Sequence, residues 1–129
     1  TRIESSAASD VYKRQLMNYT ADEIRDIVFE AKMVANHKAK EYINDKLKGE
    51  DNFPCGFAWV EIYGIKGNTK LGKQMKLAGL EKSYNGSYNI WNPSAVNFQN
   101  VDCKEAGAQA AAEILKKYGF RAYAGSRLD

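Results

Sequence analysis

Gly56-Phe57-Ala58-Trp59-Val60-Glu61-Ile62-Tyr63-Gly64 is the stretch around which the expected fold is built. Its side chains alternate with a period of two residues and a glycine closes each end, which is typical of a β-strand rather than a helix. One face carries small and β-branched groups that suit packing beneath helices, namely Ala58, Val60 and Ile62. The other face carries Phe57, Trp59, Glu61 and Tyr63. The sequence therefore predicts a strand with one core face and one aromatic face.

The segments on either side of this strand carry helix and turn signals. Thr20 and Glu23 form a capping box ahead of apolar residues at helical spacing, and this long first helix is expected to end near Gly49. A short helix is expected over 70–78, hairpin strands over 80–84 and 87–91, a helix capped at Asp102, and a closing strand over 120–125. The pair Asn85-Gly86 between the hairpin strands predicts a type I′ turn.

After the first helix, the expected order is strand, helix, strand, strand, helix, strand. This is the order of the ferredoxin-like, split βαβ arrangement. The sequence thus predicts an α+β fold, with a small antiparallel sheet in ferredoxin-like βαββαβ order and a long N-terminal helix. The alternative is a looser α+β sheet in which the short helix does not act as a crossover.

Residues 1–16 are expected to be a non-native leader. The segment Ser5 to Gln15 is the in-frame translation of a transposase-type sequencing adapter, without a mismatch, so it is excluded from fold reasoning. Met17 is then the expected start of a single globular domain over 17–129, and the adapter points to a gene from environmental sequencing. A compact single domain from that source would suit a small auxiliary protein of phage or microbial type. A natural disordered tail and a gene truncated upstream of Leu16 are the alternatives.

The overall charge and the two cysteines exclude few classes of function. The formal net charge is +3 and falls to +2 without the leader, which is too small to indicate nucleic-acid binding by itself. No apolar run is long enough to span a bilayer, so a soluble, cytoplasmic protein is expected. Cys55 and Cys103 form no CxxC pair, and no metal ligand set or cofactor motif is expected.

Basic residues gather in two segments, and one of them resembles a phosphate loop. Gly67 to Lys73 fits the pattern G-x-x-x-x-G-K, but Gln74 replaces the hydroxyl residue that would hold Mg²⁺. A helix N-terminus surrounded by lysines can still hold a phosphate or a nucleic-acid backbone. The expected polyanion-binding residues are Lys66, Asn68, Lys70, Lys73, Lys76, Lys82 and Arg121. A solvated basic helix is the alternative.

The aromatic face is the second candidate site. In a ferredoxin-like sheet it would collect Phe57, Trp59 and Tyr63 with Tyr123, and either Trp91 or Tyr88 from the hairpin. Bases stack on such side chains in sheet-type RNA-binding modules, while lysines at the edges meet phosphates. The alternative is that the long first helix covers this face and makes its aromatic residues part of the core.

No catalytic residue is expected. His37 and Cys103 have no partner nearby in sequence, and Glu61 with Glu81 would form a carboxylate pair only if the fold brought them together. The leading expectation is a binding module for nucleic acid or another polyanion, with single-stranded nucleic acid or another protein as its partner. A protein–protein interaction or inhibitor domain that uses the aromatic face is the alternative, and a small phosphate-handling enzyme comes third.

Overall fold

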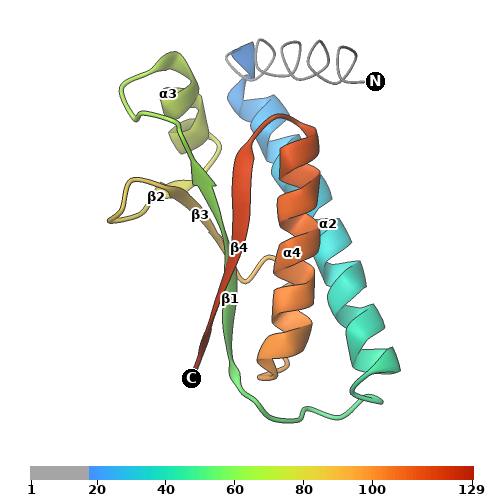
Figure 1. Cartoon of the computed structure of the whole chain (residues 1–129). Coiled ribbons are helices and arrows are strands. Elements are labelled where there is room, and N and C mark those ends of the chain that lie inside the picture. Colours follow the sequence, from blue (N-terminus) through green and yellow to red (C-terminus); the bar gives the residue numbers. More distant parts are fainter. Residues whose placement is uncertain (1–17) are drawn as a thin grey trace, which may run out of the picture.

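The computed structural model describes residues 18–129, which form three helices and one four-stranded antiparallel sheet (Figure 1). In chain order the elements are α2 (Ala21–Asp45), β1 (Gly56–Tyr63), α3 (Lys70–Leu77), β2 (Glu81–Lys82), β3 (Tyr88–Trp91), α4 (Val101–Lys117) and β4 (Arg121–Leu128). The predicted α+β class is confirmed. The predicted leader, together with Met17, lies outside the described residues.

Strand β1 lies at the centre of the sheet, whose strand order is β2-β3-β1-β4. It pairs with β3 from Trp59↔Trp91 to Ile62↔Tyr88. On its other side, all eight residues of β1 pair with β4. Strand β2 adds only two residue pairs to the outer edge of β3. The strand predicted from the alternating stretch is therefore the one on which the sheet is assembled.

Helices α2 and α4 lie together on one side of β1 and β4 (Figure 1), and the buried residues of α3 belong to the same core. Helix α4 packs on β1 and β4, while α2 packs on α4 and on α3. The inward residues Ala58, Val60 and Ile62 of β1 are buried in the resulting core. The long first helix therefore buries its apolar side against other helices, so the alternative in which it covers the aromatic face is wrong.

Small side chains let α2 and α4 approach closely. The buried positions of α2 include Ala31, Ala35 and Ala39, and α4 presents Gly107 and Ala111 to the interior. A Cβ added at Gly107 would lie 2.9 Å from the carbonyl oxygen of Ala35. This helix pair therefore depends on the absence of a side chain at Gly107.

The hairpin differs from its prediction in turn type. The Ser83 amide donates to the Ser87 carbonyl at 2.6 Å, and the Gly86 amide donates to the Ser83 carbonyl at 3.0 Å, so the loop has three residues. Gly86 has a positive φ of 90°, whereas the φ of Asn85 is not positive. A type I′ turn needs a positive φ at both of its central residues. The side-chain oxygen of Asn85 accepts the Ser87 amide at 3.1 Å, which stabilises this turn instead.

Helix ends are only partly as predicted. The Thr20–Glu23 capping box is present at the start of α2. Helix α4 begins earlier than predicted, because the N-cap is Asn100 and not Asp102: the Asn100 side chain accepts the Cys103 amide at 3.0 Å. Asn100 is fully buried and also donates to the Asn52 carbonyl at 2.7 Å. These partners identify Asn100 as a link between α4 and the preceding connector.

Replacing Gly86 tests the observed turn. A β-branched residue resists the left-handed conformation, so we expect Gly86→Val to lower the free energy of unfolding by about 1–2 kcal/mol. Asn tolerates that conformation, which makes Gly86→Asn the matched control. Urea denaturation of both variants measures the difference, and equal midpoints would contradict the assigned turn.

Candidate nucleic-acid interface

The aromatic face of the sheet lies opposite the helices. The side chains of Phe57, Trp59 and Tyr63 alternate along β1 with its buried residues, and each is partly exposed. Trp91 of β3 and Tyr123 of β4 lie on the same side and are 57% and 50% exposed. All five predicted stacking residues are thus brought together, and we call these five residues the aromatic face.

Tyr88, the alternative to Trp91, belongs to the opposite side of the sheet. Its side chain is fully buried among the core residues, and its hydroxyl donates to the Gly72 carbonyl at 3.4 Å. Burial raises the pKa of the Tyr88 phenol above its ordinary value. The two-residue period of β3 explains the difference, since Tyr88 and Trp91 are three residues apart and therefore point to opposite sides.

Two stacked indoles form the centre of the aromatic face. Trp59 and Trp91 are directly paired across β1 and β3, with ring centroids 5.6 Å apart and an interplanar angle of 9°. The Phe57 ring lies 5.7 Å from Trp91. Gly125 of β4 is the cross-strand partner of Trp59, and a Cβ there would lie 2.6 Å from the indole. Gly125 therefore leaves the space in which the Trp59 ring lies against the sheet.

Glu61 is hydrogen-bonded to both of its aromatic neighbours along β1. One carboxylate oxygen accepts from the Trp59 indole nitrogen at 3.2 Å, and the other accepts from the Tyr63 hydroxyl. The hydrogen bond to Glu61 raises the pKa of the Tyr63 phenol above its ordinary value. The carboxylate is therefore held in a fixed position beside the indole pair.

A depression of about 370 Å³ opens beside these groups. It is lined by the indole pair, by the hairpin and by the end of β4, with Trp59, Glu61, Ser83, Tyr84, Asn85, Asn89, Trp91 and Arg127. Asn89 is the cross-strand partner of Glu61. Sequence reasoning missed Asn89 and Arg127 as site residues, although the same alternation that exposes Trp91 and Tyr123 extends to them.

Four cationic side chains border the aromatic face. The Arg127 guanidinium and the Lys104 amine each lie 5.4 Å from the centre of the Phe57 ring. At the other end, the Lys116 amine lies 5.5 Å from the Tyr123 ring, and Arg121 is paired with Tyr63. Arg121 was predicted as a polyanion-binding residue, whereas Lys104, Lys116 and Arg127 were not. We call these four residues the cationic border.

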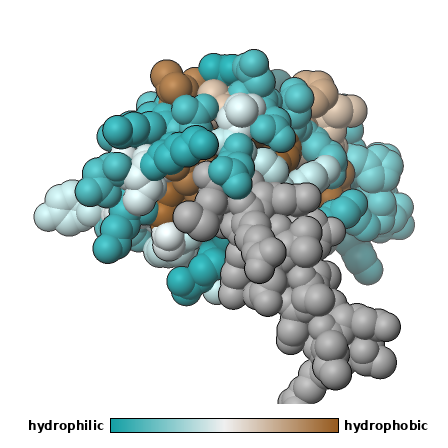
Figure 2. All heavy atoms as spheres, turned by 90° about the horizontal axis from the view of Figure 1, so that it is seen from above, coloured by the Kyte–Doolittle hydropathy of each residue, from teal (hydrophilic) through white to brown (hydrophobic). Residues whose placement is uncertain are grey.

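The other predicted cations lie elsewhere. They occupy α3, the loop before it and β2, and all of them are exposed, together with Asn68. Lys82 is paired with the buried Tyr88 and therefore lies on the helix side of the sheet, where its amine and that of Lys76 approach Gly67. Seen from the end of the molecule that carries α3, the surface is mainly hydrophilic (Figure 2). We call this group the basic end: Lys66, Asn68, Lys70, Lys73, Lys76 and Lys82.

Packing accounts for the phosphate-loop pattern. A Cβ at Gly72 would lie 2.2 Å from the Lys66 carbonyl oxygen, so a glycine is needed where α3 packs on its own loop. The Thr69 hydroxyl accepts the Gly72 amide at 3.1 Å, which satisfies one free donor of the helix N-terminus. Gln74 accepts the Ala21 amide at 2.8 Å and thereby links α3 to α2.

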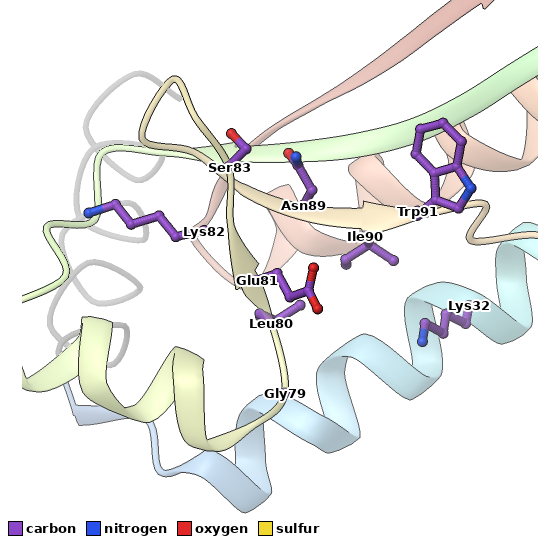
Figure 3. A pocket seen from close by; sticks show the side chains of 9 residues that line it. All are labelled: Lys32, Gly79, Leu80, Glu81, Lys82, Ser83, Asn89, Ile90 and Trp91. Carbon is purple, nitrogen blue, oxygen red and sulfur yellow. The ribbon is translucent and has the colours of Figure 1, made fainter.

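A second depression, of about 500 Å³, follows the edge of β3 where β2 ends (Figure 3). Ile90 points toward the helices, while Asn89 and Trp91 point to the other side of the strand. Lys32 of α2 and Glu81 of β2 extend into the gap between these elements. This depression shares Ser83, Asn89 and Trp91 with the one on the aromatic face but contains no stacked ring pair.

The residues considered for catalysis are not brought together into a catalytic arrangement. Cys103 is fully buried, burial raises the pKa of its thiol above its ordinary value, and its sulfur contacts the Asn100 carbonyl at 3.2 Å. His37 is exposed and lies 3.5 Å from Glu41. Glu61 and Glu81 occupy one row of the sheet with Asn89 between them, which places their backbones about 10 Å apart. Within residues 18–129, no cluster of acidic, histidine and cysteine side chains is suited to a metal ion.

No helix in the described part of the chain has the length and apolar character needed to cross a membrane. The chain matches no protein-family model, no curated protein and no solved structure. Function is therefore inferred from the geometry of the aromatic face and its cationic border.

Proposed function

We propose that this protein binds single-stranded nucleic acid through the aromatic face. The observation that carries the proposal is the parallel Trp59–Trp91 pair, which is accessible on one side of the sheet and bordered by cations. Aromatic side chains stack on unpaired bases regardless of sequence, and cations beside them neutralise phosphates. A duplex hides its base faces, so a single strand suits this surface better.

The basic end extends the path that we propose for the bound nucleic-acid strand. From Phe57 to Tyr63, β1 spans about 20 Å at roughly 3.3 Å per residue, and the lysine-bearing loop follows directly. Arg121 joins the two regions, because its side chain lies beside Gly64 at the end of β1. The proposed phosphate contacts are thus the cationic border first, and then the basic end.

We also propose that the fold is ferredoxin-like. Its support is the strand order, which is β4-β1-β3-β2 when it is counted from the other edge of the sheet, together with the sequence of strands and helices after α2. In such folds one side of the sheet carries the helices and the other remains available for a ligand. The position of the aromatic face agrees with that arrangement.

A protein partner is the second candidate. Glu61 favours a protein partner, because a carboxylate at the centre of the aromatic face repels phosphate. Exposed aromatic clusters also often mark protein interfaces. A phosphate-handling enzyme has less support, since Gln74 and Thr69 are engaged in holding α3.

Fluorescence anisotropy with labelled DNA and RNA tests the proposal on the full chain. We expect binding of single strands at low salt, weaker binding of the matching duplex, and a decrease in affinity as salt rises, because phosphate contacts release counterions. If neither single strands nor duplexes bind at low salt, the nucleic-acid proposal is wrong and the protein-partner candidate replaces it.

Salt dependence distinguishes the cationic border from other charges. Removing one phosphate-binding cation should reduce the slope of log affinity against log salt by about 0.7 for a single strand, so Arg121→Gln with Arg127→Gln should reduce it by about 1.4. Lys38→Gln with Lys40→Gln, on the exposed side of α2, is the matched control and should leave the slope unchanged. The double variant Lys70→Gln with Lys73→Gln measures how much the basic end contributes to this slope. An unchanged slope in the arginine variant would exclude the cationic border from the interface.

A further inference from the structure

We infer that the depression beside Glu61 binds guanine in preference to the other bases of a single strand. This inference rests on the proposed function and adds a base specificity to it. Its basis is a carboxylate fixed next to the indole pair, in a depression of about 370 Å³ that also contains Asn85, Asn89 and Arg127.

The carboxylate of Glu61 has unused hydrogen-bonding capacity. An ionised carboxylate only accepts, and its two oxygens offer about four lone-pair positions. Trp59 and Tyr63 occupy one position on each oxygen, which leaves one on each for a ligand. A ligand with two adjacent N–H donors therefore matches the two oxygens together.

Among the bases, guanine has that pair of donors. Its Watson–Crick edge presents the ring N1–H and the exocyclic amine side by side. Adenine and cytosine present one amine beside an unprotonated ring nitrogen, and uracil presents one N–H between two carbonyl oxygens that a carboxylate repels. A base whose face stacks against the indole pair can thus direct only the guanine edge to Glu61 with two hydrogen bonds.

The surrounding charges favour a nucleotide over a cationic side chain. An arginine would also stack on an indole and bind a carboxylate with two hydrogen bonds. However, the cationic border repels a basic peptide and attracts the phosphates of a nucleotide. Arg127 lines the same depression as Glu61, so a guanine there has a phosphate partner close by.

Single substitutions in an oligouridine test this specificity without forming guanine quadruplexes. We compare the uridine octamer with octamers that carry one central guanosine, adenosine or inosine. Guanosine should improve binding to the wild-type full chain by at least about fivefold over uridine, the lower end for one bidentate base contact. Inosine lacks the exocyclic amine and should fall between the two.

Glu61→Gln should remove the guanosine preference, because an amide offers one acceptor where the carboxylate offered two. Glu81→Gln is the matched control, since Glu81 lies in the same row of the sheet but outside this depression, and it should keep the preference. Near-ultraviolet circular dichroism of the indole pair checks that each variant is folded. The inosine comparison needs no variant and tests the inference even if Glu61→Gln does not fold.

The outcomes separate the two proposals. If no octamer binds, the proposed function and this inference both fail. If all four octamers bind equally, or if Glu61→Gln retains the guanosine preference, only the base specificity fails. If an arginine-rich peptide binds in a Glu61-dependent manner and displaces the octamers, the depression is a site for a cationic partner and the inference is wrong.

Discussion

Trp59→Ala is expected to weaken binding of a single strand by roughly 1–3 kcal/mol, or about 5- to 150-fold, with little change in salt dependence. The indole is a member of the stacked pair, so its removal takes away one stacking surface and also exposes one side of Trp91. The cations that meet phosphates remain in place, and the counterion release therefore stays the same. Anisotropy titrations at several salt concentrations measure both quantities.

Trp59→Phe is the control for this experiment. A phenyl ring retains a stacking face, so most of the affinity should remain, although the variant has no indole nitrogen to donate to Glu61. Gly125→Val provides an independent test, because its side chain would occupy the place of the Trp59 ring while leaving both indoles in the chain. If Trp59→Ala is folded and binds as tightly as the wild type, stacking on this pair does not contribute to binding.

Gly107→Leu is expected to lower the free energy of unfolding by about 3 kcal/mol, the upper end for an overpacked core position. The first added carbon would lie 2.8 Å from the Ser94 side chain and 2.9 Å from the Ala35 carbonyl oxygen. Because the second of these atoms belongs to the backbone of α2, the two helices would have to separate. Urea denaturation gives the magnitude.

Gln109→Leu is the matched control on the same helix. Gln109 is exposed and its side chain donates to Glu105 on its own helix, at 3.3 Å, so this variant should change stability little. A Gly107→Leu variant as stable as the control would show that the packing between α2 and α4 is looser than described. Binding by folded Gly107→Leu should be unaffected, since the aromatic face lies on the other side of the sheet.

Local sequence signals predicted the elements and the aromatic face well. The alternation of β1 identified both of its faces, and the same period placed Tyr123 on the aromatic side, while it left Trp91 and Tyr88 as alternatives. The Thr20 capping box marked the start of α2 because its hydrogen bonds join residues three apart. These features depend on neighbours in the sequence, which is why they can be predicted from it.

Features that depend on distant partners were not predictable in this way. Asn100 was missed as an N-cap because its buried position depends on Asp51 and Asn52, almost fifty residues earlier. The amphipathic pattern of α2 predicted that its apolar side is buried, but it did not predict that this side packs against α4. In the site, Asn89 became a partner of Glu61 only through the pairing of β3 with β1, and no local motif encodes that pairing.

The outer edge of β4 has a consequence for self-association. The Asp129 amide donates to the carbonyl of Cys55, the residue before β1, at 3.0 Å. Because hydrogen bonding alternates along an antiparallel pair, the register then has the odd-numbered residues of β4 bonding to β1. Residues 122, 124, 126 and 128 direct their backbone amides and carbonyls outward, where no strand of the described chain meets them. An unpaired edge of this length is a template for a second copy, and charged side chains along it oppose such pairing. Arg121 and Arg127 are therefore expected to oppose the addition of a second chain at this edge, besides their proposed contacts with phosphates. Neutralising both should lower the concentration at which the chain associates with itself, so the salt titrations of this double variant belong below that concentration.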